Sequence, residues 1–361
     1  YEDAIAAITT ISIGLLYLTD ALQLWHLYVS VVVAGGFGQV QTLAYQASVS
    51  TIVPKQQYTR AGSMAAAGHY GASIVGPAIA SLIYPIAGLT GIVALDLLTF
   101  AVALSTLFAA DIPQPDRSQE LSQNNSQDKS QGQSQSEQFI SQLTFGFRHV
   151  WQRPSLRSLL LITVLFTFAH DVGGTLYSPM ILARTGGNAQ ALASVSAMAG
   201  IGGVVGAIVV SSWGGPKNPV HGMLIGYMGA GISKMGFGIG RSLSVWLPAQ
   251  VCSSLNFPLL SSARSAIWMA QISSESQGRV FAANSLFVQG AKVLSLLVAG
   301  PLAAHWLEPA MMPQGALVTV FGTYFGSGPG SGLALLYTLC ALIMLLIGIG
   351  GFFLPSFKHL E

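Results

Sequence analysis

The residues most able to carry chemistry are two titratable side chains inside an apolar stretch. Asp171 directly follows His170 midway along residues 158–182. A carboxylate in the hydrocarbon core of a membrane is costly, so it is a functional candidate by default. Desolvation favours the neutral form of a carboxyl group, and histidine titrates near neutrality. The pair therefore predicts a proton-coupling site; the alternative is a carboxylate neutralised by a structural ion pair or by water in a cavity.

A lysine in another apolar stretch is the expected partner of this pair. Lys292 lies midway along residues 280–304, at the same expected depth as Asp171, and Gln289 precedes it by one helical turn on the same face. Lys292 either pairs with Asp171, or faces a cavity and binds anionic groups of a substrate, or lines a wet cavity without a specific task.

Two polar residues share one face of the apolar stretch 242–267. Asn256 and Arg264 are two helical turns apart, and both are candidates for the lining of a substrate cavity. Arg264 is also near the expected inner surface, where its guanidinium can reach water. Lys234 is expected near the outer end of its own stretch and to reach water in the same way.

The first part of the chain offers further candidates. Asp96 is either a second proton-coupling residue or a hydrogen-bonded structural acid. His69, near the middle of residues 61–84, is either a cavity residue or a satisfied interior histidine. Gln41 and Tyr45 are candidates for the cavity lining as well.

Several function classes lack any support in the sequence. There is no GxxxxGK[ST] phosphate loop, no Cys/His cluster with metal-binding spacing and no nucleophile elbow. The net charge is only +2, so nothing favours nucleic acid. We therefore expect no enzyme, no cofactor and no bound metal.

Composition indicates an all-α membrane protein. The chain is 52% hydrophobic and only 8% charged, against about 25% charged in a soluble domain. A membrane span needs about 20 mostly apolar residues. Ten stretches qualify: 4–22, 25–47, 61–84, 90–109, 158–182, 189–212, 220–239, 242–267, 280–304 and 333–354.

The distribution of Lys and Arg predicts the orientation. If the chain starts on the cytoplasmic side, the inside segments carry ten basic residues and the outside loops only Arg184 and Arg241. This bias predicts a multi-pass protein of the plasma (inner) membrane with both ends cytoplasmic.

One long inside segment, residues 110–157, separates the two groups of spans. Its part Ser118–Glu137 is a Ser/Gln-rich run with almost nothing apolar to bury, and it is expected to be disordered. Apolar residues between Phe139 and Trp151 then recur at helical spacing, which predicts a helix at the membrane surface. The segment is expected to be a simple linker. A long outside loop, His305–Ser331, is rich in Gly and Pro and is expected to have irregular backbone.

A repeated element predicts that two spans precede this sequence. Val53–Met64 and Ile272–Ala283 each combine a polar hinge, an arginine and a helix rich in small residues. Arg60 opens the third span, whereas Arg279 opens the ninth. If the halves are equivalent six-helix units, residues 1–109 hold helices three to six, and residues 158–361 hold a complete half.

These features resemble the major facilitator superfamily, and within it the exporter branch of macrolide efflux proteins and the enterobactin exporter. The stretches that carry the resemblance are Leu182–Gly187 (LARTGG), Trp213–Lys217 (WGGPK), Gly278–Val280 (GRV), Ala299–Ala303 (AGPLA) and Gly326–Gly332 (GSGPGSG). The resemblance implies a twelve-helix fold of which ten helices are present here, four and then six.

The resemblance also implies gating elements. Arg60 and Arg279 open the repeated helices, and Gly71, Gly76 and Pro77 match the exporter motif loosely, with unusual spacing. Proline in a membrane helix permits a bend; the alternative is an ordinary kink with close packing. The basic signature loop of the superfamily is absent, and its second copy survives only as Gly214–His221, with one lysine.

The expected function is proton-coupled export of small amphipathic molecules of the drug, macrolide or siderophore type, by alternating access of a monomer in the lipid bilayer. A lipid or lysolipid flippase of the same fold and a non-transporting membrane scaffold are the alternatives. The small-molecule substrate and protons are the expected partners.

Overall fold

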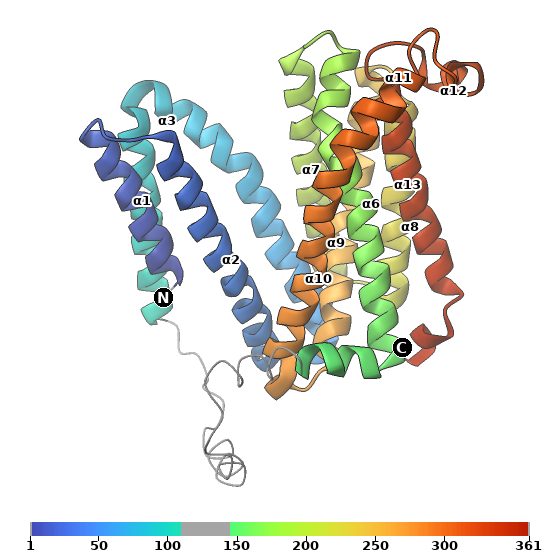
Figure 1. Ribbon diagram of the computed structural model, residues 1–361. Coiled ribbons are helices and arrows are strands. Elements are labelled where there is room, and N and C mark those ends of the chain that lie inside the picture. The colour runs from blue at the N-terminus through green and yellow to red at the C-terminus, as the bar shows by residue number, and fades with distance from the viewer. Residues whose placement is uncertain (1, 110–144, 360–361) are drawn as a thin grey trace, which may run out of the picture. The chain divides into compact units, whose positions relative to one another are not determined.

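The computed structural model describes residues 2–109 and 145–359 (Figure 1). Every regular element in these residues is helical, and the described part of the chain contains no strand. The chain divides into two compact units: Tyr1–Ile52 with Val75–Leu143, and Val53–Ile74 with Thr144–Glu361. The run Ser118–Glu137 and the first part of the predicted surface helix, residues 139–144, lie outside the described residues.

Three helices build the first unit. They are α1 (Glu2–Leu18), α2 (Leu24–Ile52) and the later part of α3 (Tyr58–Ala109). Gly88 interrupts α3 with φ 60° and ψ −158°, a combination that only glycine adopts without strain. This break lies between the two predicted stretches 61–84 and 90–109.

Six long helices build the second unit. They are α6 (Pro154–Arg184), α7 (Ala189–Trp213), α8 (Pro219–Ile239), α9 (Leu243–Gln271), α10 (Ser274–Pro301) and α13 (Ser331–Phe352). Helix α9 packs against α7 and α8, α13 packs against α8 and α6, and α10 packs against α6. The result is a continuous bundle (Figure 1).

Glycine allows the closest of these helix contacts. A Cβ at Gly202 or Gly206 of α7 would lie about 2.6 or 2.5 Å from a backbone oxygen of α9, at Val251 or Leu255. No real side chain tolerates such contacts, so the α7–α9 approach requires glycine. The GxxxG spacing in the sequence therefore marks a true helix interface here.

The start of α3 also belongs to the second unit. Gly62 packs against Ser262 of α9, and Tyr70 packs against Gly203 of α7. The sequence predicted residues 1–109 as the first half. The compact units differ from this over Val53–Ile74, which belongs to the second unit because these contacts hold it against α7 and α9.

The expected number of ten membrane spans is not confirmed. Five helices in the described residues are long and apolar enough to cross a membrane: Ile86–Thr106, Pro154–Arg184, Ala189–Trp213, Ser276–Ala310 and Ser331–Phe352. Helices α8 and α9 are long enough, but their glycine, serine and basic residues lower the mean hydropathy. In the first unit, the apolar runs Ala7–Leu18 and Leu24–Gly38 are shorter.

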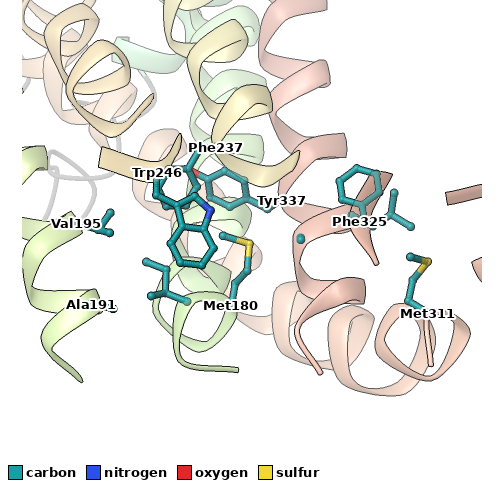
Figure 2. Packing of buried hydrophobic residues seen from close by; sticks show 11 residues of the cluster. Met180, Ala191, Val195, Phe237, Trp246, Met311, Phe325 and Tyr337 are labelled. Atoms are coloured by element: carbon teal, nitrogen blue, oxygen red, sulfur yellow. The ribbon is translucent and has the colours of Figure 1, made fainter. Parts of the chain in front are cut away.

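The segment between α10 and α13 is more ordered than expected. The sequence predicted irregular backbone over His305–Ser331, but the structure contains a π-helical turn η2 (Leu302–Leu307) and the short helices α11 (Glu308–Ala310) and α12 (Val318–Phe325). Buried apolar residues below these elements anchor them, with Trp246, Phe237 and Tyr337 at the centre (Figure 2). We call residues 302–331 the cap.

A short helix over residues 145–152 follows the undescribed linker residues. Its Gly146 packs against the backbone of Arg279 at the start of α10, and the rings of Phe147 and Phe287 are 5.0 Å apart. Arg153 donates a hydrogen bond of 3.2 Å to the carbonyl oxygen of Gln271. This helix is therefore docked on the α9–α10 corner.

Candidate functional site

The centre of the site is the predicted pair on α6. The Nδ1 atom of His170 and the Oδ1 atom of Asp171 are 2.8 Å apart. The other carboxylate oxygen, Oδ2, is buried and has no hydrogen-bond partner among the described residues. A buried polar atom without a partner is costly, so Oδ2 is poised to accept a proton or a hydrogen bond.

Aromatic rings enclose the histidine. His170 lies edge-on to Phe257 of α9, with ring centres 4.9 Å apart, and parallel to Phe166 of α6 at 6.2 Å. Phe166 in turn stacks on Tyr227 of α8 at 3.8 Å. Residues of three helices therefore surround the histidine, while the side chains of His170 and Asp171 stay 29% and 24% exposed, so water can reach the pair.

Lys234 of α8 also lies at this site, which sequence reasoning did not predict. Its side chain is only 8% exposed, so the expectation that it reaches water at the end of its helix is wrong. The ammonium donates a long hydrogen bond of 3.4 Å to the hydroxyl of Tyr337 and lies 5.8 Å from the ring centre of Phe257. It also interacts electrostatically with Asp171 and His170.

A signal for Lys234 was present in the sequence. Lys234 and Tyr227 are seven residues apart, so they share one face of α8. Helix α8 packs on α9 and α13, and the exposed residues Ile225 and Ile232 lie on its other face. The face that carries Tyr227 and Lys234 is therefore the packed one. Depth along the span was the wrong criterion, since the packed face decides whether a lysine reaches water.

The predicted partner Lys292 is placed differently. Its side chain on α10 is exposed, and among the described residues neither Lys292 nor Lys234 makes a direct ion pair with Asp171. Its electrostatic influence on His170 is the weakest of those acting on that ring. Gln289, one turn earlier, is partly buried.

The two polar residues of α9 face α8. Asn256 donates a hydrogen bond of 2.7 Å to the carbonyl of Cys252, and its amide packs against Gly229 of α8. Arg264 is partly buried and interacts electrostatically with Tyr227. Asn256 is next to Phe257, so it borders the region of His170 and Lys234.

A second charged group lies at the cap. Arg184 donates to the carbonyl oxygens of Gly238, Gly240 and Phe325 at 3.2, 2.6 and 2.9 Å. The carboxylate of Glu308 accepts hydrogen bonds from the backbone N–H groups of Gly330 and Leu333, at the start of α13. These residues connect the ends of α6, α8, α11, α12 and α13.

The sequence of the chain matches the family model described as Major Facilitator Superfamily over residues 4–296. The chain belongs to the Major Facilitator Superfamily. Membership identifies it as a multi-pass membrane transporter and not an enzyme, and the predicted resemblance is confirmed.

The relatives of this superfamily member include macrolide exporters. The chain is 25% identical to macrolide efflux protein A of Enterococcus faecalis over 270 residues, which are 72% of the chain and 77% of that protein. It is 23% identical to macrolide efflux protein A of Streptococcus pyogenes over 293 residues, 79% of the chain and 69% of that protein.

The residues expected to gate a superfamily transporter do not form one cluster. Arg279 lies over the ring of Phe145 at 5.6 Å, on the docked helix 145–152. Arg60 is exposed at the start of α3, where its carbonyl accepts a hydrogen bond from Ser63. Their roles in gating stay predictions.

The loosely matched exporter motif shows no close packing. A Cβ at Gly71 or Gly76 would meet no atom within 4 Å. Pro77 lies within α3, and the non-helical residue of that helix is Gly88. The packing alternative for Gly71 and Gly76 thus has no support, and a bend at Pro77 stays a prediction.

The candidates in the first part of the chain are dispersed. Asp96 accepts a hydrogen bond of 2.8 Å from Thr10, which supports its reading as a structural acid. Gln41 and Tyr45 lie exposed on α2. The rings of His69 and Tyr70 are 5.8 Å apart, and His69 is exposed.

One cavity of about 290 Å³ lies within the first unit, between α1 and α2. Its walls are mainly apolar, and they include Trp25 and His26, whose rings are tilted by 34° with their centres 3.8 Å apart. It contains none of the predicted site residues.

Proposed function

We propose that the protein is a secondary active exporter that couples the outward movement of small amphipathic molecules to the inward movement of protons. The observation that carries the proposal is the His170–Asp171 pair, whose carboxylate has one buried oxygen without a partner. Similarity to two macrolide efflux proteins supports a drug of the macrolide type as substrate.

The pair suits proton coupling because it can hold one proton in two ways. When Asp171 is ionised, its Oδ1 accepts the Nδ1–H of neutral His170. A proton from water then forms an O–H bond at Oδ2 of Asp171 or is held on the imidazole ring. Release of that proton to the opposite side regenerates the starting state, so the cycle is balanced.

The remaining features of the proposal follow from the superfamily and from the distribution of basic residues. The protein works by alternating access, as a monomer in the plasma (inner) membrane, with both ends of this chain cytoplasmic. The candidates for contact with the substrate stay those expected from the sequence: Gln289, Lys292, Asn256, Arg264, His69, Gln41 and Tyr45.

Transport by the full-length protein in liposomes tests the proposal. An imposed pH gradient should drive uptake of a radiolabelled macrolide into inside-out vesicles, and an uncoupler should abolish it. Asp171→Asn should lose gradient-driven transport while it still binds the drug, because asparagine keeps the shape but cannot take up a proton.

Three results would contradict this assignment. Full uncoupler-sensitive transport by Asp171→Asn would place the coupling proton elsewhere. Movement of a fluorescent lysolipid between leaflets, without drug transport, would instead favour the flippase. An absence of both activities would favour the scaffold.

A further inference from the structure

The charges around Asp171 point to a partner that the sequence did not suggest. Lys234 is more than nine-tenths buried, and a buried ammonium is costly unless an opposite charge compensates it. In the described part of the chain, its electrostatic partners are Asp171 of α6 and Cys340 of α13. Of these, only Asp171 carries a charge under ordinary conditions.

The bonding of Lys234 is incomplete. An ammonium has three donors, but in the described structure Lys234 makes a single hydrogen bond, to Tyr337 at 3.4 Å. The faces of Tyr337 and Phe257, at 5.3 and 5.8 Å, stabilise the cation without using its donors. A lysine kept only for structure would be expected to satisfy its donors, as Arg184 does.

Phe257 links the two charged groups in space. Its ring contacts the imidazole of His170 on one side and the ammonium of Lys234 on another. The carboxylate of Asp171 bonds to the same imidazole and keeps Oδ2 free. The site therefore contains an unsatisfied buried acceptor and an unsatisfied buried donor around one aromatic ring.

We propose that Lys234 is the counter-cation of Asp171 across the rings of Phe257 and His170, without a direct ion pair in the described structure, and that proton uptake at Asp171 removes the charge that compensates this buried ammonium during transport. The existence of the pair is independent of the transport activity, whereas its role in coupling rests on the proposed function. When a proton binds Oδ2, the net charge of His170, Asp171 and Lys234 rises from zero to +1. Lys234 then lacks compensation, which favours a state in which its ammonium reaches water.

The other titratable groups around this site are few. Tyr337 and Cys340 face Lys234 from α13, and His170 and Asp171 face it from α6. Helix α9 contributes Phe257, while its Arg264 acts on Tyr227. Lys292 of α10 acts weakly on His170. None of these supplies a second carboxylate.

A double-mutant cycle on the purified full-length protein tests the pair. The variants are Lys234→Met, Asp171→Asn and the combination, and the readout is the thermal unfolding midpoint in lipid nanodiscs. Asp171→Asn leaves the buried ammonium without compensation, and Lys234→Met leaves the carboxylate without its counter-charge. Each single change should therefore lower the midpoint, whereas the double variant should recover most of the loss. The matched cycle of Asp171→Asn with Lys292→Met should be additive.

Additive effects of Lys234→Met and Asp171→Asn would overturn the pair, and recovery in the Lys292 cycle would assign it to Lys292 instead. If a single variant does not accumulate as folded protein, the amount of folded protein in the membrane becomes the readout. The double variant must then accumulate more than Lys234→Met, and equal accumulation rejects the proposal.

Transport tests the role in coupling. Removal of a nearby positive charge makes proton uptake easier, so the pH of half-maximal gradient-driven transport should rise by about one unit or more in Lys234→Met. Exposed Arg148→Met is the control and should leave the profile in place. An unchanged profile in Lys234→Met rejects the coupling role. Failure of the unmutated protein to transport rejects the proposed function, and the thermal cycle still decides the pair.

Discussion

The interior site and the cap use buried charges in opposite ways. At the cap, Arg184 and Glu308 direct their charges at backbone groups, with three carbonyl acceptors for the guanidinium and two N–H donors for the carboxylate. In the interior, Asp171 uses one of its two oxygens, and Lys234 makes one long hydrogen bond. Both regions belong to the same unit.

This difference separates a structural charge from an exchangeable one. A charge bonded to several backbone groups cannot change partner without leaving those groups unsatisfied, which costs about 1–3 kcal/mol for each. A charge with open bonding capacity can gain or lose a proton, or a partner, at much smaller cost. The cap is therefore expected to govern stability, and the interior to govern the response to pH.

The largest expected effect on stability is at Arg184. Arg184→Ala removes the donors of three carbonyl groups and opens the contact between α8 and α12, so we expect a loss of at least about 2 kcal/mol in the free energy of unfolding. Thermal unfolding in nanodiscs measures this loss. The pH profile of transport by the folded fraction should keep its midpoint, and a displaced midpoint would break the distinction between the two regions.

A smaller effect is expected at Glu308. Glu308→Gln keeps an oxygen that can accept a hydrogen bond but removes the negative charge at the start of α13, and we expect a loss of about 1 kcal/mol. Glu308→Ala should cost more because both N–H groups lose their acceptor. Equal unfolding midpoints for the two variants would show that the hydrogen bonds of Glu308 contribute nothing.

The sequence alone predicted the helical class, the superfamily and the His170–Asp171 pair. Composition and hydropathy determine the class, while two neighbouring titratable residues in an apolar span are visible without coordinates. It also identified the cap segment, but predicted irregular backbone there, because glycine and proline hide the short helices α11 and α12.

Lys234 and Arg184 show why the rest was not predictable. The position of each along its helix suggested contact with water, but their environment depends on which helices pack around them. That packing follows from close contacts at glycines such as Gly231, where a Cβ would lie 2.8 Å from the backbone nitrogen of Leu345. A single sequence does not reveal which of its 41 glycines form such contacts.

Tyr337 sharpens the comparison from the side of the interior. Tyr337→Phe removes the hydroxyl that accepts from Lys234 but keeps the ring below the ammonium. Because the bond is long, we expect a change of only about 0.5 kcal/mol in the free energy of unfolding. The pH of half-maximal transport should move measurably nonetheless, since the hydroxyl is the hydrogen-bond partner that the structure gives this ammonium. If Tyr337→Phe instead lowered stability strongly and left the pH profile of transport unchanged, Tyr337 would serve stability, as Arg184 and Glu308 do.

The smallest effect on stability is expected at Lys292, which tests whether burial or mere presence in a span decides the role of a lysine. Lys292 is exposed on α10, whereas Lys234 is buried. Lys292→Met should therefore change the free energy of unfolding by no more than about 0.5 kcal/mol, as is usual for surface substitutions.

If the ammonium of Lys292 attracts anionic groups of a substrate, Lys292→Met should lower transport of an anionic drug relative to that of a neutral one, and Lys292→Arg should restore it. Paired transport assays with the two drugs measure that ratio. A loss of stability equal to that of Lys234→Met, reversed by Asp171→Asn, would instead show that Lys292 is the partner of the carboxylate and that exposure in this structure does not distinguish the two lysines.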